Sequence, residues 1–162
     1  MSFSYRNRFN AVYFLVEKKA PAKKPKLYFS QKDESGPATL PEGFEVFENP
    51  RGQVFLRRIG TQVIKADELE LVQKVLSKLG LTNRFEPWID KNRLTLYDIP
   101  SARQAVMRFV LMEKKKRIFM PERFCFRGSV DDWISIGGPG TLLVLCQKYC
   151  RHLGKESLYE LY

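Results

Sequence analysis

The sequence contains a single histidine, three cysteines and no long apolar run. Each of these features makes one class of protein less expected. His152 is the only histidine, and no nucleophile and acid accompany it at a spacing typical of a catalytic triad. Cys125, Cys146 and Cys150 form no paired framework, which favours a reducing compartment over secretion. No stretch reaches the roughly 20 apolar residues of a membrane span. We therefore expect a non-enzymatic protein of the cytoplasm, or of the nucleus in a eukaryote, without a membrane span or a cofactor.

A metal site is also not expected. Cys146 and Cys150 are four residues apart and share one face of a predicted helix, but they fall within its apolar stripe. A structural zinc site normally uses closely spaced pairs of ligands with a second matching pair. Buried core cysteines explain this spacing better than zinc ligands do.

Positive charge is the strongest bias in the composition. The chain carries 28 Lys and Arg against 18 Asp and Glu, a net charge of +10 at neutral pH. Residues 1–36 hold 8 basic and 3 acidic groups, residues 37–100 hold 9 of each, and residues 101–162 hold 11 and 6. Such a surface attracts nucleic acid, acidic lipid or acidic protein. The alternative is a basic surface that supports solubility and has no polyanionic partner.

A weak internal repeat suggests the architecture. Arg84–Phe85 is followed by Pro100, sixteen positions after the arginine, and Arg123–Phe124 is followed by Pro139 at the same offset. Each intervening stretch resembles two short strands, and each proline precedes an amphipathic pattern typical of a helix. Repetition at about 40 residues usually means one supersecondary unit used several times. We therefore predict an α+β fold with three ββα-like units after an N-terminal hairpin.

The predicted elements fall into two regions that pack as one domain. Residues 1–36 form a basic hairpin with strands at 9–16 and 27–30, joined by a flexible loop at 17–26 that is rich in lysine and proline. Residues 37–162 form the compact body of three units. Its predicted strands are 44–46, 54–56, 85–89, 94–97, 124–126 and 133–136. Its predicted helices are 67–79, 142–153 and one that begins at 102 and ends near 114–117. Capping boxes are expected at Asp67 with Glu70 and at Ser101 with Gln104.

Basic and aromatic residues alternate at Tyr5–Phe9 and at Arg123–Arg127. Proteins that hold single-stranded nucleic acid use cations on phosphates and rings on bases in this way. In a strand, however, alternating phenylalanines can simply face the core while the arginines face solvent. The predicted nucleic-acid-binding residues are Arg6, Arg8, Lys18, Lys19, Lys23, Lys24, Lys26, Lys114, Lys115, Lys116, Arg117, Arg123 and Arg127.

The segment Gly137–Thr141 is a second candidate site, for an anion. A glycine-rich turn between a strand and a helix can present backbone N–H groups to a negative charge. The segment lacks the lysine and hydroxyl of a Walker A motif and does not contain G-x-G-x-x-G. A turn in which Pro139 presets the first helical turn is the simpler explanation. The predicted anion-binding residues are Gly137, Gly138, Gly140 and Thr141.

Taken together, these patterns favour a basic binding protein whose partner is DNA or RNA. The alternative is a protein-interaction or structural module that uses exposed strand edges or the aromatic C-terminal tail, Ser157–Tyr162. The sequence does not choose a specific ligand or an oligomeric state.

Overall fold

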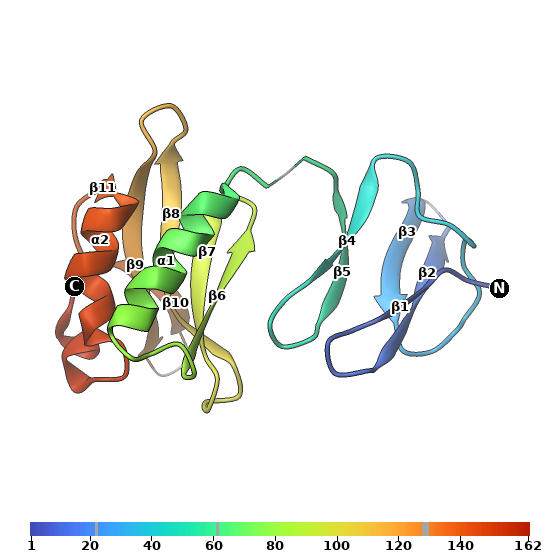
Figure 1. The fold of residues 1–162 in the computed structure, drawn as a ribbon. Coiled ribbons are helices and arrows are strands. Elements are labelled where there is room, and N and C mark those ends of the chain that lie inside the picture. The colour runs from blue at the N-terminus through green and yellow to red at the C-terminus, as the bar shows by residue number, and fades with distance from the viewer. Residues whose placement is uncertain (22, 61, 128–129) are drawn as a thin grey trace. The chain divides into compact units, whose positions relative to one another are not determined.

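Strands dominate this protein. The computed structural model describes residues 1–21, 23–60, 62–127 and 130–162. Strands hold 42% of the chain and helices 19%. The chain divides into two compact units, unit 1 (Met1–Thr61) and unit 2 (Gln62–Tyr162) (Figure 1). Residues 37–61 thus group with the N-terminal residues, whereas the sequence analysis placed them in a body of residues 37–162.

The predicted architecture of three ββα-like units is wrong. The described residues contain two α-helices, α1 (Ala66–Lys78) and α2 (Leu142–Tyr149), and between them the strands form one continuous sheet. The two matched Arg-Phe pairs occupy different places in that sheet. Phe85 begins the edge strand β6 (Phe85–Asp90), whereas Phe124 lies inside β9 (Ile118–Arg127), which has partners on both sides.

The error arises at the predicted helix that begins at 102, most of which is strand β8 (Gln104–Glu113). Met107, Phe109 and Leu111 are buried and alternate with half-buried residues, which is the period of a strand and not of a helix. The apolar residues of this segment are so frequent that they satisfy the spacing of a helix and of a strand. The segment becomes a strand because it pairs with β7 (Arg93–Asp98) on one side and β9 on the other. The Ser101 hydroxyl caps no helix and donates a hydrogen bond to Asp98 Oδ2 at 3.0 Å.

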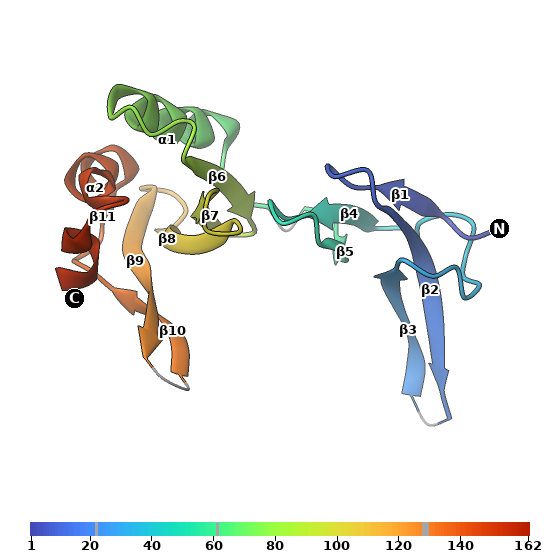
Figure 2. The ribbon, with the colours of Figure 1, turned by 90° about the horizontal axis from the view of Figure 1, so that it is seen from below.

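The sheet of unit 2 is an antiparallel meander. Strands β6, β7 (Arg93–Asp98), β8, β9 and β10 (Val130–Ser135) pair in chain order, and β11 (Gly140–Thr141) pairs with the beginning of β9. Both helices cover the same face of this sheet (Figures 1 and 2). A 3-10 turn, Cys150–His152, continues α2, and another, Glu156–Glu160, carries the buried Leu158. The core joins Phe85, Leu94, Leu96, Met107, Phe109 and Phe119 to Val72, Leu76, Leu142, Leu145, Cys146 and Tyr149.

The predicted helix 67–79 is confirmed as α1, but its start is fixed differently. The Lys65 backbone N–H donates to Glu68 Oε1 at 2.9 Å, so the expected Asp67 and Glu70 box is wrong. Arg117 then binds the same carboxylate: its Nε donates to Glu68 Oε2 at 3.1 Å, and its Nη2 donates to Glu68 Oε1 and to the Val63 carbonyl. Residues 114–117 are therefore the β8–β9 turn and not a helix end, and Arg117 adopts φ 53° there.

Unit 1 contains a three-stranded antiparallel sheet in the order β1 (Ser4–Arg6), β2 (Val12–Ala20), β3 (Lys23–Ser30). The predicted flexible loop at 17–26 is wrong, because its described residues extend the β2–β3 hairpin: Glu17 lies opposite Leu27 and Lys18 opposite Lys26. An edge strand needs ladder hydrogen bonds on one side only, so β3 accommodates Pro25.

The second hairpin of unit 1, β4 (Phe44–Glu48) and β5 (Val54–Arg58), has the predicted strands and turn. Gly52 adopts φ 80° in that turn, and its carbonyl accepts a hydrogen bond from Asn7 Nδ2 at 2.8 Å. The Tyr5 hydroxyl donates to Glu48 Oε1 and the Arg8 N–H to Glu48 Oε2, both at 2.8 Å. These bonds fasten the hairpin to the N-terminal segment.

We expect Arg117→Ala to lower the free energy of unfolding of unit 2 by about 2–3 kcal/mol, because the part-buried Glu68 carboxylate loses its charged partner. Lys116→Ala removes an exposed cation from the same turn and should change stability by less than about 0.5 kcal/mol. Urea unfolding of the two variants measures the difference. Equal stabilities would contradict a structural role for Arg117.

Tyr5 predicts a pH dependence for unit 1. Burial raises the pKa of the Tyr5 phenol above its ordinary 10.0, and the hydrogen bond to Glu48 raises it further. With a raised folded-state pKa, the phenol's contribution to stability is present below pH 10 and is lost as pH rises through the folded-state value. Tyr5→Phe should cost about 1 kcal/mol at neutral pH and flatten the alkaline loss. Amide exchange in β1 and β2 against pH measures this, with Tyr162→Phe as the exposed control. Identical alkaline profiles for wild type and Tyr5→Phe would contradict it.

Candidate nucleic-acid interface

The register of the unit 1 sheet brings three predicted cations to one face. Lys18 lies directly opposite Lys26, Val16 opposite Tyr28, and Arg6 opposite Val12. Residues directly opposite each other in an antiparallel pair share a face, and so do alternate residues along a strand. Phe14 lies on the same face, opposite both Ser4 and Ser30. We call the set of Arg6, Lys18, Lys26, Phe14 and Tyr28 the cationic face.

The two ends of the cationic face are open to solvent. Arg6, Lys18 and Lys26 are exposed, and Phe14 and Tyr28 are half-buried. Val16, which lies between Phe14 and Lys18 on the same face, is 2% exposed, so the middle of this face is covered. The opposite face carries the fully buried Leu15 and the ring of Phe29, which packs edge-on against Phe3 with centroids 6.3 Å apart. Charges therefore occupy the ends of a face whose middle belongs to the interior of unit 1.

Lys18 and Lys26 form a like-charge pair across two strands. Side chains directly opposite in an antiparallel pair have Cβ atoms about 4.5–5.5 Å apart, and like charges there are destabilising. Lys19 and Lys24, also exposed, lie just beyond this pair where the register shifts. A polyanion bound between the two ammonium groups would replace their repulsion with attraction.

The cations of this sheet differ from many arginines of the protein in their lack of acidic partners among the described residues. Among the residues that the structure describes, no ion pair involves Arg6, Lys18, Lys19, Lys24 or Lys26. Unpaired ammonium and guanidinium groups can bind phosphate without first breaking an internal contact.

Arginines on the sheet of unit 2 differ in this respect. Arg108 Nε lies 2.6 Å from Glu122 Oε1, and its guanidinium lies 4.2 Å from the centre of the Trp133 ring. Arg93 pairs with Asp90 at 3.9 Å, and Arg103 pairs with Glu86 at 3.8 Å. Acidic residues thus neutralise these three arginines, which offer less net attraction to phosphate than unpaired cations do.

Two further predicted arginines are engaged within unit 2. Arg123 is 5% exposed, and its guanidinium donates to the carbonyls of Leu161 at 2.8 Å and Tyr159 at 3.2 Å. Arg117 holds the beginning of α1, as described above. Both side chains therefore have internal partners and fix the fold. Lys114, Lys115 and Lys116 are exposed on the β8–β9 turn.

Three of the predicted nucleic-acid-binding residues remain to be placed, namely Arg8, Lys23 and Arg127. The Arg8 guanidinium donates to the Pro50 carbonyl at 3.1 Å and lies 5.6 Å from the centre of the Phe9 ring. The side chains of Lys23 and Arg127 lie outside the part of the chain whose burial and contacts are described.

The predicted anion-binding turn has structural functions. A Cβ added at Gly137 would lie 1.7 Å from the Tyr149 hydroxyl, so this close approach requires glycine. Gly140 and Thr141 pair with Phe119 and Ile118 as strand β11. Packing against Tyr149 and pairing with β9 thus account for this sequence without a ligand.

The cysteines and the histidine are also engaged in the fold. Cys125, Cys146 and Cys150 are free and buried. A hydrogen bond with Cys150, together with burial, raises the pKa of the Cys146 thiol, which keeps it protonated and weakly nucleophilic. His152 Nδ1 lies 2.9 Å from Ser157 Oγ. Within residues 1–21, 23–60, 62–127 and 130–162, no three His, Cys, Asp or Glu residues are grouped closely enough to hold a metal ion.

Sequence reasoning missed the aromatic part of the cationic face. Phe14 and Tyr28 were expected only as strand residues, and the lysines beside them were assigned to a loop. The signal was present in β3, where Lys24, Lys26 and Tyr28 recur at every second position. The two prolines within 17–26 favoured a loop, so this alternation was not interpreted as a strand.

Comparison of the chain with protein-family models, with curated proteins and with solved structures found no match. No helix in the described part of the chain is both long enough and apolar enough to cross a bilayer. The candidate site therefore depends on its own geometry and charge.

The packing at Gly137 gives a matched pair of substitutions. Gly137→Ala should destabilise unit 2 by about 1–3 kcal/mol, because its Cβ collides with the buried Tyr149 ring. Gly138→Ala meets nothing within 4 Å of its Cβ and should be nearly neutral. Thermal unfolding compares them. An anion-binding role would instead require both variants to weaken binding of inorganic phosphate, measured by calorimetry.

Proposed function

We propose that this protein binds single-stranded nucleic acid on the cationic face of unit 1. The observation that carries the proposal is the opposed pair Lys18 and Lys26, exposed and without acidic partners, on the same face as Tyr28 and Phe14. Proteins that bind single strands combine a basic surface that follows the phosphates with aromatic side chains that contact bases. Both components are brought together here by strand register.

The size of the face fits such a ligand. Strands rise about 3.3 Å per residue, so the six steps along β2 from Val12, opposite Arg6, to Lys18 span about 20 Å. A single strand lying along β2 could therefore contact Arg6 at one end and the lysine pair at the other. The half-buried rings of Phe14 and Tyr28 lie between these ends, beside the buried Val16, and bases would pack against the exposed parts of these two rings.

The alternative function, a protein-interaction module, has less support in the described residues. Strand addition needs an accessible edge, and two of the edge strands, β3 and β6, contain Pro25 and Pro87, whereas the edge strands β1 and β10 contain no proline. Arg123 holds the C-terminal segment against its own unit, and Leu158 is buried there. A tail that is already docked would have to be released before it could enter a partner's groove.

Fluorescence anisotropy with a labelled oligothymidylate of about 20 nucleotides tests the proposal. Three phosphate contacts, from Arg6, Lys18 and Lys26, predict a slope of about −2 in log K against log salt, or roughly a 20-fold loss between about 50 and 200 mM. Lys18→Glu with Lys26→Glu should weaken binding at least about tenfold and flatten the slope. Tyr28→Ser should weaken binding without changing the slope, because it removes stacking and not charge.

The control is Lys114→Glu with Lys115→Glu, which changes net charge equally but lies on the β8–β9 turn of unit 2. It should retain most of the affinity. An equal loss in both double variants would mean that net charge alone attracts the strand. No detectable binding at about 50 mM salt would refute the proposal.

A further inference from the structure

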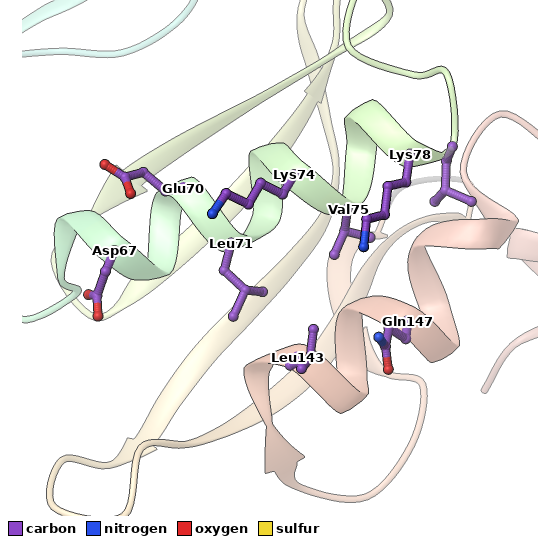
Figure 3. Close-up of a pocket in the computed structure, with 9 residues that line it drawn as sticks. Asp67, Glu70, Leu71, Lys74, Val75, Lys78, Leu143 and Gln147 are labelled. Carbon is purple, nitrogen blue, oxygen red and sulfur yellow. The ribbon is translucent and has the colours of Figure 1, made fainter.

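Unit 2 has an apolar groove that the proposed nucleic-acid site does not use. The groove lies between α1 and α2, has a volume of about 540 Å³, and includes Leu71, Val75 and Leu143 in its lining (Figure 3). Leu143 is 45% exposed, and Leu79, which also lines the groove, is 42% exposed. Exposed apolar side chains that gather around a hollow are typical of a surface that another protein covers.

On the α1 side of the groove, acidic residues come first along the helix and basic residues follow. Asp67 and Glu70 precede Lys74 and Lys78, and all four side chains line the groove (Figure 3). Helix dipoles favour acids in the first turn and bases in the last, but that effect fades within one turn of each end. Glu70 and Lys74 lie near the middle of the 13-residue helix. The dipole therefore does not account for them.

These four charges have no ion-pair partners within the part of the chain that the structure describes. The spacing of Glu70 and Lys74 would allow a bond along the helix, yet none forms. Unpaired charges of both signs around an apolar floor suit a partner with the opposite order of charges.

A second copy of α1, running antiparallel, has that order. With the dyad near the middle of the helix, Asp67 of one copy lies opposite Lys78 of the other, and Glu70 lies beside Lys74 of the other copy. Leu71 falls near the axis in both copies. A twofold interface brings the same patch of both subunits together and therefore requires this self-complementarity.

We infer that the α1–α2 groove is a homodimer interface, in which a second copy of the chain packs its α1 antiparallel against the first. Exposed leucine side chains provide the apolar contact, and the acid and base pairs fix the direction. Few apolar residues are exposed here, so we expect a weak dimer with a dissociation constant in the high micromolar range.

Charge reversal tests both the dimer and its direction. Asp67→Lys with Glu70→Lys makes this face of α1 entirely basic, and Lys74→Glu with Lys78→Glu makes it entirely acidic. Each double variant should be monomeric in sedimentation velocity where the wild type self-associates, up to about 1 mM. An equimolar mixture of the two should form a heterodimer, because opposite charges then meet in every pair.

Leu143→Asp should abolish association without unfolding the chain, because this side chain is 45% exposed. Circular dichroism and thermal unfolding check that each variant stays folded. A wild type that remains monomeric up to about 1 mM overturns the inference and leaves the groove to a different protein. Double variants that self-associate like the wild type, or a mixture that stays monomeric, overturn the antiparallel arrangement. These measurements contain no nucleic acid and are independent of the proposed function.

Discussion

The fold of unit 2 depends on burying one face of a single antiparallel sheet under two helices. Phe85, Leu96 and Phe109 come from neighbouring strands, yet all contribute to the core that Val72 and Leu145 complete. Each such side chain contributes about 1.5–3 kcal/mol when fully buried. Strand β8 lies at the middle of the sheet and supplies Met107, Phe109 and Leu111 to this core. The alternation of buried and half-buried residues along β8 is therefore required by the fold. A helix at the same residues would leave β7 and β9 without their shared partner strand.

The sequence predicts those strands and helices best that have a clear turn motif or a clear apolar period. The turn around Gly52 between β4 and β5, and the apolar stripe of α1, were predicted close to their observed bounds. Residues 102–113 were not, because their apolar residues satisfy helical and strand spacing together and only the neighbouring strands decide between them. The prolines near 17–26 indicated a loop for a similar reason. Whether proline interrupts a strand depends on which side of it is paired, and this is a property of the sheet.

The number of basic residues is known from the sequence, but which of them are exposed and unpaired in the fold could be predicted only in part. The excess of basic residues in residues 1–36 directed attention to the lysines of β2 and β3, but it could not indicate that Lys18 lies opposite Lys26. Arg117 and Arg123 were predicted to bind nucleic acid alongside those lysines, whereas the side chains of both arginines bind groups of unit 2 itself. Guanidinium groups bond readily to carboxylates and carbonyls, so a buried arginine is usually occupied. A count of cations therefore overstates the number that can reach a phosphate.

The two proposed surfaces use charge in opposite ways, and this difference lets them act together. Lys18 and Lys26 lie opposite each other as like charges, which a bound polyanion would offset, whereas α1 carries charges of both signs that an antiparallel second copy would pair. A polyanion would gain little from the α1 groove, because its acids offset its bases. Dimerisation through α1 would nevertheless bring two cationic faces onto one molecule. If one strand spans both faces, the second contact forms at the effective concentration set by the first, and a shallow basic surface of modest affinity becomes a tighter binder of long strands.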